Sequence, residues 1–312
     1  MDARTSKIDV MKKELLRDLL KDFGDNVQFD YDLKKKNWFN IGGKSKVFFK
    51  AKNLKELLKF LKKLDNKEKI FIIGAGSNLL ITDDVYDGVV IKLSNHFNNI
   101  SLLGEDVIIA GSAVLDKSLS NYAMQNNLSG FEFLSCIPGT VGGGIKMNAG
   151  CFGKEFKDIL ISVQAIDFNG NVKTIPSKEI KFDYRNNDLS ENLIFVSASF
   201  KGKKSNSKKI NEEMNRLKEE KDKNQPTQIK TSGSTFKNPI NQTQKKVWEL
   251  IKDSVPLDKT FGDAGISEKH CNFFVNKGNA SFKDMIKLIN YVSEKVLKKN
   301  GINLEKEIKI LE

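Results

Sequence analysis

The sequence is poor in arginine, histidine, proline and cysteine, and it contains no long apolar run. Its 312 residues include only four arginines, two histidines, five prolines and three cysteines. Three scattered cysteines are too few for a disulfide framework or a zinc-binding motif. No apolar stretch approaches the roughly 18 residues of a membrane span, and none follows the N-terminus as the core of a signal peptide. We therefore expect a reduced, cytoplasmic protein with no metal site and no membrane partner.

Positive charge is plentiful by contrast, and nearly all of it comes from lysine. Lys and Arg total 52 against 40 Asp and Glu, which gives a net charge of +12. Such an excess favours an anionic partner, and nucleic acid is one candidate. The lysines are, however, spread along the chain as on solvated helix faces, and arginine, the usual reader of base edges, is nearly absent. We expect no nucleic-acid partner, whereas a small anionic ligand suits the charge.

The spacing of apolar residues predicts an α+β fold. Helical spacing predicts helices over 8–23 and 54–61, and short β-rich runs dominate between residues 40 and 200. The expected strands are 47–49, 70–73, 89–93, 107–110, 160–168, 172–175 and 194–200. Asn169-Gly170 predicts a hairpin with a type I′ turn between two of them, because both residues tolerate positive φ.

A lysine-rich stretch separates this region from the C-terminal third. Residues 201–209 contain no apolar side chain and predict a linker. A charged helix is expected over 210–223, and an apolar stripe predicts a helix over 282–300 between caps at Ser281 and Gly301. The last segment alternates as a strand does, with Ile302, Leu304, Ile308 and Ile310 on one face and Glu305, Glu307 and Lys309 on the other.

Two glycine-rich loops stand out from this background. The strand at 70–73 leads into Gly74–Asn78, where small residues let backbone N–H groups approach an anion, although a tight turn explains this loop equally well. The second loop, 137–150, holds five of the 22 glycines. Because glycine costs conformational entropy wherever it is ordered, we expect the backbone of this loop to approach a bulky ligand closely.

Both loops belong to a series of motifs that resembles one family, the flavin-dependent UDP-N-acetylenolpyruvoylglucosamine reductases of bacterial cell-wall synthesis. In chain order, the motifs are 37–43, 74–80, 130–150, Tyr184-Arg185, the block from 225 to 239, and the C-terminal pair 270–280 and 304–308. Each is moderately specific alone, but six in the correct order across nearly the whole chain are highly specific.

The resemblance implies an FAD-binding vanillyl-alcohol-oxidase (PCMH-type) fold of two subdomains, followed by a C-terminal α/β substrate domain. The expected division is an N-terminal helical segment 1–35, FAD-binding subdomains 36–95 and 96–200, the linker 201–209 and the substrate-binding domain 210–312. The chain resembles a short form of the family, because it lacks the tyrosine-bearing insertion with which some members cap their substrate.

The activity that the resemblance implies is that of a UDP-N-acetylmuramate dehydrogenase. Such an enzyme uses FAD and NADPH to reduce UDP-N-acetylglucosamine enolpyruvate to UDP-N-acetylmuramate in peptidoglycan precursor synthesis. The expected partners are the UDP-sugar and NADPH, and the expected state is a monomer. Two alternatives stay open: another FAD-dependent oxidoreductase of the same fold with a different substrate, and a basic binding module without activity.

Arg185 is the first of three residues to which the resemblance gives a catalytic role. Reduction of an enolpyruvyl ether generates an enolate-like species beside the substrate carboxylate, and a guanidinium can form two charge-assisted hydrogen bonds to such a group. The alternative for Arg185 is a structural ion pair with Asp183 or Asp188.

Ser234 and Glu307 are the other two. By resemblance, Ser234 donates the proton to the enolate carbon, and Glu307 orients Ser234 or hydrogen-bonds the substrate carboxyl in its protonated form. Ser234 could instead be a turn serine, and Glu307 a solvated glutamate on an edge strand. Glu305 shares the face of Glu307 and is its local competitor.

The motifs also imply binding residues. The expected FAD-binding residues are Asn40, Ile41, Gly42, Gly74, Gly76, Ser77, Asn78, Leu79, Pro138, Gly139, Thr140, Gly143, Asn148, Ala149 and Gly150. The expected substrate-binding residues are Tyr184, Lys237 and Asn238, and no metal ligand is expected. Cys136 and Cys271 stand where the family has small residues, so we expect them to pack without thiol chemistry.

Overall fold

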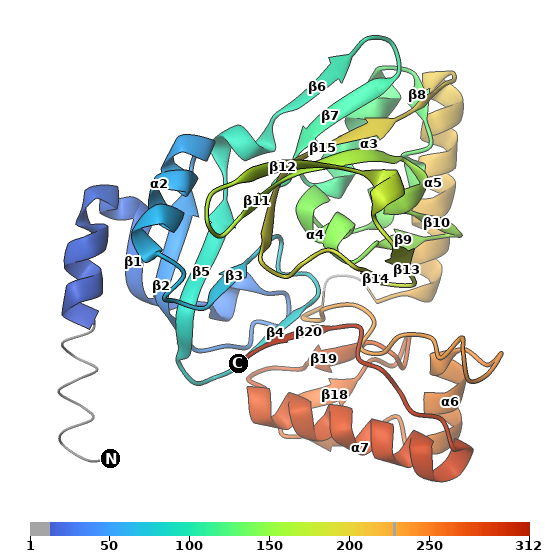
Figure 1. Ribbon diagram of the computed structural model, residues 1–312. Coiled ribbons are helices and arrows are strands. Elements are labelled where there is room, and N and C mark those ends of the chain that lie inside the picture. Colours follow the sequence, from blue (N-terminus) through green and yellow to red (C-terminus); the bar gives the residue numbers. More distant parts are fainter. Residues whose placement is uncertain (1–12, 227–228) are drawn as a thin grey trace, which may run out of the picture.

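The computed structural model describes residues 13–226 and 229–312, and its two largest sheets lie beside a C-terminal α/β unit (Figure 1). Residues 13–20 are helical and continue into η1 (Lys21–Asn26), with Leu16, Leu20 and Phe23 buried. This agrees with the second half of the amphipathic helix expected over residues 8–23. Its first half, residues 8–12, lies outside the described residues.

The first sheet has four strands in the order β1-β2-β5-β3. The strands β1 (Val27–Asp32), β2 (Lys44–Ala51), β3 (Ile70–Ile72) and β5 (Tyr86–Leu93) form it, with β2, β5 and β3 parallel and β1 antiparallel. Helix α2 (Leu54–Leu64) connects β2 to β3 and begins at Asn53, whose side chain accepts a hydrogen bond from the Glu56 N–H. The buried face of α2 packs on this sheet together with Leu16, Leu20 and Phe23.

The second sheet is antiparallel, in the order β12-β11-β15-β7-β6. Its strands are β6 (Ile100–Leu103), β7 (Val107–Gly111), β11 (Leu160–Asp167), β12 (Val172–Pro176) and β15 (Leu193–Lys201). Helices α3 (Asp116–Gln125) and α4 (Val141–Lys146) pack into the same core as this sheet. All seven strands expected between residues 40 and 200 are present, while α3 was not anticipated because its apolar stripe is weak.

The hairpin between β11 and β12 forms, but its turn is not the expected type I′. Of the two central residues only Gly170 has positive φ, at 88°, and Asp167 N–H donates to Asn171 O at 3.1 Å, which leaves a three-residue loop. The Asp167 carboxylate accepts hydrogen bonds from the N–H groups of Asn169 and Asn171. This side-chain bonding stabilises the longer turn.

The expected linker is mostly ordered, which corrects that expectation. Lys201 ends β15, and β16 (Lys203–Lys204) pairs with β8 (Leu128–Ser129) before α5 begins. Helix α5 (Ser207–Asn224) buries Ile210, Met214 and Leu217 and packs on η4 (Glu132–Cys136) and α3 of the second subdomain. The polar stretch is ordered by backbone pairing, and the helix expected to start the substrate domain packs with the second subdomain (Figure 1).

The C-terminal unit packs α6 (Val247–Ser254) and α7 (Phe282–Asn300) around one core with the short sheet β17 (Thr260–Phe261), β18 (Ala264–Ile266) and β19 (Phe274–Asn276). The expected caps of α7 are confirmed, because Ser281 and Asp284 form a capping box and Gly301 has φ of 70°.

The remaining short elements are η2 (Lys34–Lys36), β4 (Leu79–Ile81), η3 (Asn95–Asn98), β9 (Gly150–Cys151), β10 (Lys154–Glu155), η5 (Phe156–Asp158), η6 (Ser177–Glu179), β13 (Phe182–Asp183), β14 (Asn186–Asn187) and β20 (Lys309–Leu311).

The final strand is shorter than expected. Only β20 is a strand, parallel to β4, and the chain bends at Ile308 just before it. The N–H groups of Glu307 and Ile308 both approach the Thr235 carbonyl, so the alternation breaks there. As a result Leu311 is buried with the first subdomain, whereas Ile310 lines a cavity together with Glu307.

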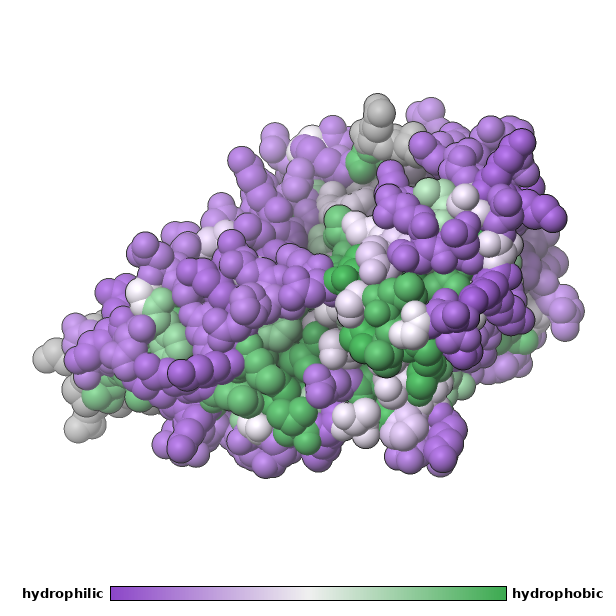
Figure 2. Space-filling view, turned by 90° about the horizontal axis from the view of Figure 1, so that it is seen from above, coloured by the Kyte–Doolittle hydropathy of each residue, from purple (hydrophilic) through white to green (hydrophobic). Residues whose placement is uncertain are grey.

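The molecular surface is largely hydrophilic. Figure 2 shows hydrophilic residues over most of one face, with apolar residues gathered near its middle. None of the helices in the part of the chain that the structure describes is long and apolar enough to cross a membrane.

Candidate active site

One cavity of about 1220 Å³ collects the sequence motifs that were far apart in the chain. Its wall is formed by the loop after β3, the loop 137–150, Arg185, the segment 231–234 and the residues before β20. All three structural units therefore contribute to it. Its size exceeds what one small ligand usually fills, so there is room for two large ligands.

The first glycine loop offers unused backbone donors to this cavity. Within residues 13–226 and 229–312, the N–H groups of Ala75, Gly76, Ser77 and Asn78 donate no hydrogen bond. Gly76 has φ of 68°, and a side chain on it would overlap the carbonyl of Lys36. Lys92 Nζ donates to the Gly74 carbonyl at 2.8 Å, which places a cation beside the loop. Free N–H groups next to a cation form an anion-binding cradle.

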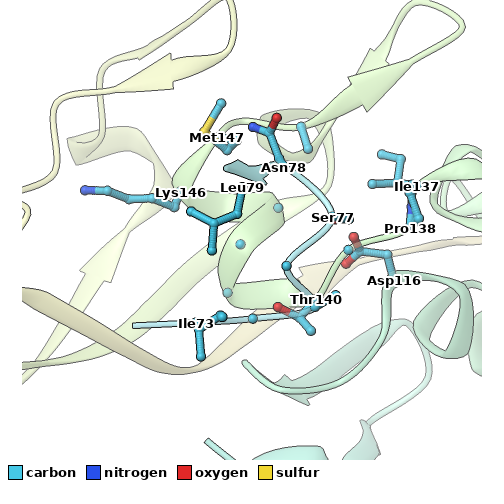
Figure 3. Close-up of a pocket in the computed structure, with 18 of the residues that line it drawn as sticks. Ile73, Ser77, Asn78, Leu79, Asp116, Ile137, Pro138, Thr140, Lys146 and Met147 are labelled. Atoms are coloured by element: carbon cyan, nitrogen blue, oxygen red, sulfur yellow. The ribbon is translucent and has the colours of Figure 1, made fainter. Parts of the chain in front are cut away.

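The second glycine loop meets the first at Thr140. A side-chain carbon on Gly74 would lie only 2.6 Å from Thr140 Oγ1, so the two loops approach more closely than any larger residue would allow. The N–H groups of Gly139 and Thr140 also donate no hydrogen bond to a described residue. Figure 3 shows Thr140, Pro138 and Ser77 around the same space.

The glycines of the second loop have more than one cause. A side chain on Gly144 would overlap the Phe156 ring, one on Gly150 would overlap the Lys154 carbonyl, and one on Gly142 would press on Ser112. At Gly143 the nearest atom, Thr140 Oγ1, is 3.5 Å away. Approach to a ligand thus explains Gly143, while packing within the protein already requires glycine at the other three positions.

Opposite the loops, Arg185 forms a buried ionic corner. Its Nε lies 2.9 Å from Glu307 Oε1, its Nη2 donates to the Gly150 carbonyl at 2.6 Å, and its Nη1 lies 3.8 Å from Glu155 Oε1. The side chains of Arg185 and Glu307 are each 17% exposed. Neither of the aspartates considered as an alternative partner from the sequence pairs with Arg185; Asp188 instead accepts a hydrogen bond from the Lys181 N–H.

The two candidate acids at the C-terminus differ sharply. Burial raises the pKa of the Glu307 carboxyl, and the charges of Arg185 and Lys237 partly oppose that rise. Glu305 is 72% exposed and pairs with Lys237 at 2.6 Å. Only Glu307 lines the cavity, and Asn78 Nδ2 of the first loop donates to its backbone carbonyl at 3.0 Å. The structure therefore favours Glu307 over Glu305 as the acid of the site.

Ser234 is the hydroxyl of its segment that remains available. Thr231 Oγ1 donates to Phe274 O at 2.6 Å, and Ser232 Oγ donates to Leu79 O at 3.0 Å, so both are buried structural hydroxyls. Ser234 follows Gly233, which has φ of 78°, and lines the cavity without a side-chain hydrogen bond to any described residue.

The expected binding residues divide into two groups. Eleven of the fifteen expected FAD-binding residues line the cavity: Gly74, Gly76, Ser77, Asn78, Leu79, Pro138, Gly139, Thr140, Gly143, Ala149 and Gly150. Asn40, Ile41, Gly42 and Asn148 are not part of its lining. Ile41 lies in the C-terminal core, and the Asn148 amide donates to the Glu155 carboxylate and the Asp183 carbonyl, so these two residues are engaged within the protein.

The expected substrate residues are also outside the lining. Lys237 pairs with Glu305, and Asn238 Nδ2 donates to the Tyr184 hydroxyl at 3.3 Å. The Asn238 Oδ1 atom accepts from the Val247 N–H at the start of α6. Tyr184 precedes Arg185 in the chain, and the Arg185 guanidinium carbon lies 5.0 Å from the centre of the Tyr184 ring, whereas Lys237 pairs with Glu305.

Three residues of the cavity wall were missed by the sequence. Asp116 begins α3, and neither of its carboxyl oxygens has a partner. The Cys151 thiol, 15 positions further along the chain, lowers the pKa of Cys136 to about 6. The expectation that Cys136 packs without thiol chemistry stays a prediction. No motif includes Asp116 or Cys151, and the motif that includes Cys136 did not indicate its pairing, because their proximity to the cavity depends on the packing of α3, η4 and β9. No described group of His, Cys, Asp and Glu could hold a metal.

Comparisons with known proteins agree with this geometry. Residues 225–311 match the model of the C-terminal domain of UDP-N-acetylenolpyruvoylglucosamine reductase, and residues 45–176 match an FAD binding domain. The chain is 65% identical over 301 residues to the UDP-N-acetylenolpyruvoylglucosamine reductase of Pelagibacter ubique (strain HTCC1062), covering 96% of this chain and all of the relative. It is 45% identical over 282 residues to that of Rickettsia bellii (strain RML369-C), covering 90% and 92%.

A solved structure supports the same comparison. The chain resembles the crystal structure of UDP-N-acetylenolpyruvylglucosamine reductase from Thermus caldophilus with a TM-score of 0.78 and 29% identity. The match covers 92% of this chain and 98% of that chain. The expected fold, an FAD-binding unit of two subdomains followed by a C-terminal α/β domain, is confirmed.

Proposed function

Because the chain belongs to the family of UDP-N-acetylenolpyruvoylglucosamine reductases, we propose the roles that its cleft residues play in the reaction of that family. The enzyme is an FAD-dependent oxidoreductase that uses NADPH to reduce UDP-N-acetylglucosamine enolpyruvate to UDP-N-acetylmuramate in peptidoglycan synthesis. The observation that carries the assignment of roles is the placement of Ser234 and the Arg185–Glu307 pair in one cavity with both glycine loops. A different substrate or a binding module without activity has no support from these relatives.

The two glycine loops are proposed to hold FAD. The free N–H groups of residues 75–78, 139 and 140 fit the diphosphate of a dinucleotide, which needs many donors and little side-chain volume. Lys92 adds positive charge at the same place. FAD bound there, once reduced by NADPH, would supply the hydride for the vinyl group of the substrate.

Arg185 is proposed to hold the carboxylate of the substrate and to stabilise the negative charge that develops next to it. Its guanidinium is fixed in advance by Glu307 and by the Gly150 carbonyl, so it needs little reorganisation during the reaction. Ser234 is proposed to give its proton to the enolate carbon, since its hydroxyl faces the cavity and has no competing acceptor among the described residues.

Glu307 is proposed to position Arg185 and the substrate carboxyl. Its buried carboxyl, with a raised pKa, can accept from Arg185 through one oxygen while the other oxygen hydrogen-bonds the substrate. Lys237, Asn238 and Tyr184 are proposed to contact the uridine diphosphate at the outer edge of the cleft, where their present pairings are only partly buried or exposed.

We also propose that the enzyme acts as a cytoplasmic monomer. A single chain supplies every residue to which a role is assigned above. Sedimentation would test the oligomeric state, and a stable dimer would contradict the proposal.

The experiment that tests the roles separates the two half-reactions. Ser234→Ala should leave the reduction of bound flavin by NADPH unchanged, because Ser234 takes no part in it. The reoxidation of the flavin by the enolpyruvyl substrate should slow by about 1000-fold, the usual size of a general-acid contribution. Stopped-flow absorbance of the flavin measures both rates. Equal slowing of both would contradict the proposal and assign Ser234 a structural role. The control variant is Ser254→Ala on α6. Thr231→Val is unsuitable as a control, because the Thr231 hydroxyl is buried and hydrogen-bonded.

A further inference from the structure

Asp116 is a buried carboxyl group that the proposed mechanism does not use. It is the first residue of α3 and has no exposed surface. Neither carboxyl oxygen has a hydrogen-bond partner among the described residues, yet the residue forms part of the cavity wall. In Figure 3 its carboxyl group points from α3 toward the loop that carries Ser77. Buried polar groups are nearly always hydrogen-bonded, so an orphaned carboxyl at a ligand cavity requires an explanation.

The surrounding backbone holds this carboxyl in place. The Asp116 N–H donates to the Gly139 carbonyl at 3.2 Å. A side-chain carbon on Gly139 would lie 2.5 Å from Asp116 Oδ2, so glycine at this position makes room for the carboxyl. Asp116 therefore lies directly against the loop whose N–H groups at 139 and 140 are free.

Among the residues that the structure describes, no cation pairs with the Asp116 carboxyl. The charged side chains of the neighbouring elements have other partners or face solvent. Lys117 of α3 is exposed, and Glu132 of η4 accepts a hydrogen bond from the Gly130 N–H. Three lysines donate to backbone carbonyls: Lys221 of α5 to Cys136, Lys92 of β5 to Gly74, and Lys146 of α4 to Leu189. Burial alone accordingly raises the pKa of Asp116 well above its usual value. This shift favours the protonated carboxyl, which is an O–H donor, and neither of its oxygens has a partner among the described residues.

We propose that Asp116 is a cofactor-binding residue, whose protonated carboxyl donates a hydrogen bond to a phosphate oxygen of the dinucleotide held by the two glycine loops. This inference rests on the assignment of those loops to the diphosphate. The loops offer the free backbone N–H groups of residues 75–78, 139 and 140, and Asp116 adds a buried side-chain donor to this cradle. An ionised carboxylate at the same place would repel the diphosphate, since charges interact strongly where water is excluded.

The test compares flavin binding to full-length wild type, Asp116→Asn and Asp116→Ala, each freed of flavin, between pH 5 and pH 9. Quenching of flavin fluorescence reports the affinity, with FAD as the probe and riboflavin, which has no phosphate, as the control ligand. Wild type should bind FAD more weakly as pH rises through the pKa of Asp116. Asp116→Asn remains a neutral donor and should bind with little pH dependence, while Asp116→Ala should bind FAD roughly tenfold more weakly and riboflavin as wild type does.

Urea unfolding of the same flavin-free proteins checks the protonation state independently. An acid whose folded pKa is raised contributes stability that is complete below its unfolded pKa and is lost as pH rises through the folded pKa. Wild type should therefore lose stability relative to Asp116→Asn as pH rises. A wild type whose FAD affinity and stability both rise with pH, or an Asp116→Ala variant that binds FAD as wild type does, would overturn the proposal. Failure of wild type itself to bind FAD would instead overturn the loop assignment.

Discussion

The two sides of the cleft bind by different means. The glycine-loop side presents backbone N–H groups of residues 75–78, 139 and 140, and the opposite side presents the paired side chains of Arg185 and Glu307. Backbone donors are set by chain conformation and suit any phosphate, whereas a guanidinium held by a carboxylate selects a planar anionic group. The difference implies that cofactor binding depends on backbone shape, and reaction specificity on a few side chains.

The ionic side should respond most strongly to substitution. Arg185→Lys keeps the charge but cannot bond Glu307 and the Gly150 carbonyl together, and we expect the reaction with the enolpyruvyl substrate to slow about 100-fold. Arg216→Lys is the matched control, because Arg216 is exposed on α5 and pairs with Glu213 and Glu220. Steady-state kinetics measures both. An effect of similar size at Arg216 would show that the loss is not specific to the cleft.

A comparison of the two acids sharpens the assignment of this side. Glu307→Gln should slow the same step about tenfold, since it weakens the support of Arg185 and the contact to the substrate carboxyl. Glu305→Gln should change the rate by less than about twofold, because an exposed ion pair contributes little. Both variants are assayed by flavin reoxidation. A larger loss at Glu305 would refute the choice of Glu307.

Substitutions in the second glycine loop should change the rate of the reaction with the substrate least. Some of them should weaken FAD binding, and others should lower the stability of the fold. Gly144→Ala pushes a methyl group into the Phe156 ring and should lower the free energy of unfolding by about 1 kcal/mol or more. Gly143→Ala has space around it and should unfold as wild type does, but its methyl group enters the cavity and should weaken FAD severalfold. Urea denaturation and flavin titration measure the two quantities. Equal behaviour of both variants would remove the distinction between packing and ligand-facing glycines.

The sequence predicted local structure better than packing. Apolar spacing located all seven strands between residues 40 and 200 and the capped helix α7, because those patterns reflect burial within one element. The helix after the linker was located too, but its contacts with η4 were not, since a charged amphipathic helix can bury its few apolar residues on either neighbour. The hairpin turn was assigned to the wrong type because the Asp167 side chain, not the Asn-Gly pair alone, determines it.

The residues of the site also divide into those that the sequence identified and those that only the structure shows. Arg185, Ser234 and Glu307 came from motif resemblance, and the structure brings them to one cavity, although 122 residues separate the arginine from the glutamate. Asn40, Ile41, Gly42 and Asn148 belong to the same motifs but lie outside the cavity lining, which a motif cannot reveal. Asp116 and Cys151 belong to no motif, and their buried or paired state becomes visible only through the tertiary structure.

The sequence by itself determined the family, the cofactors and the chemical groups available, because these depend on residue types in a fixed order. Only the tertiary structure decided which glycines face a ligand, which glutamate is buried and which carboxyl is left without a partner. The physical reason is that pKa, exposure and close approach are properties of three-dimensional neighbours. Residues such as Asp116 and Gly139 are 23 positions apart in the chain and acquire a shared function only where the fold presses them together.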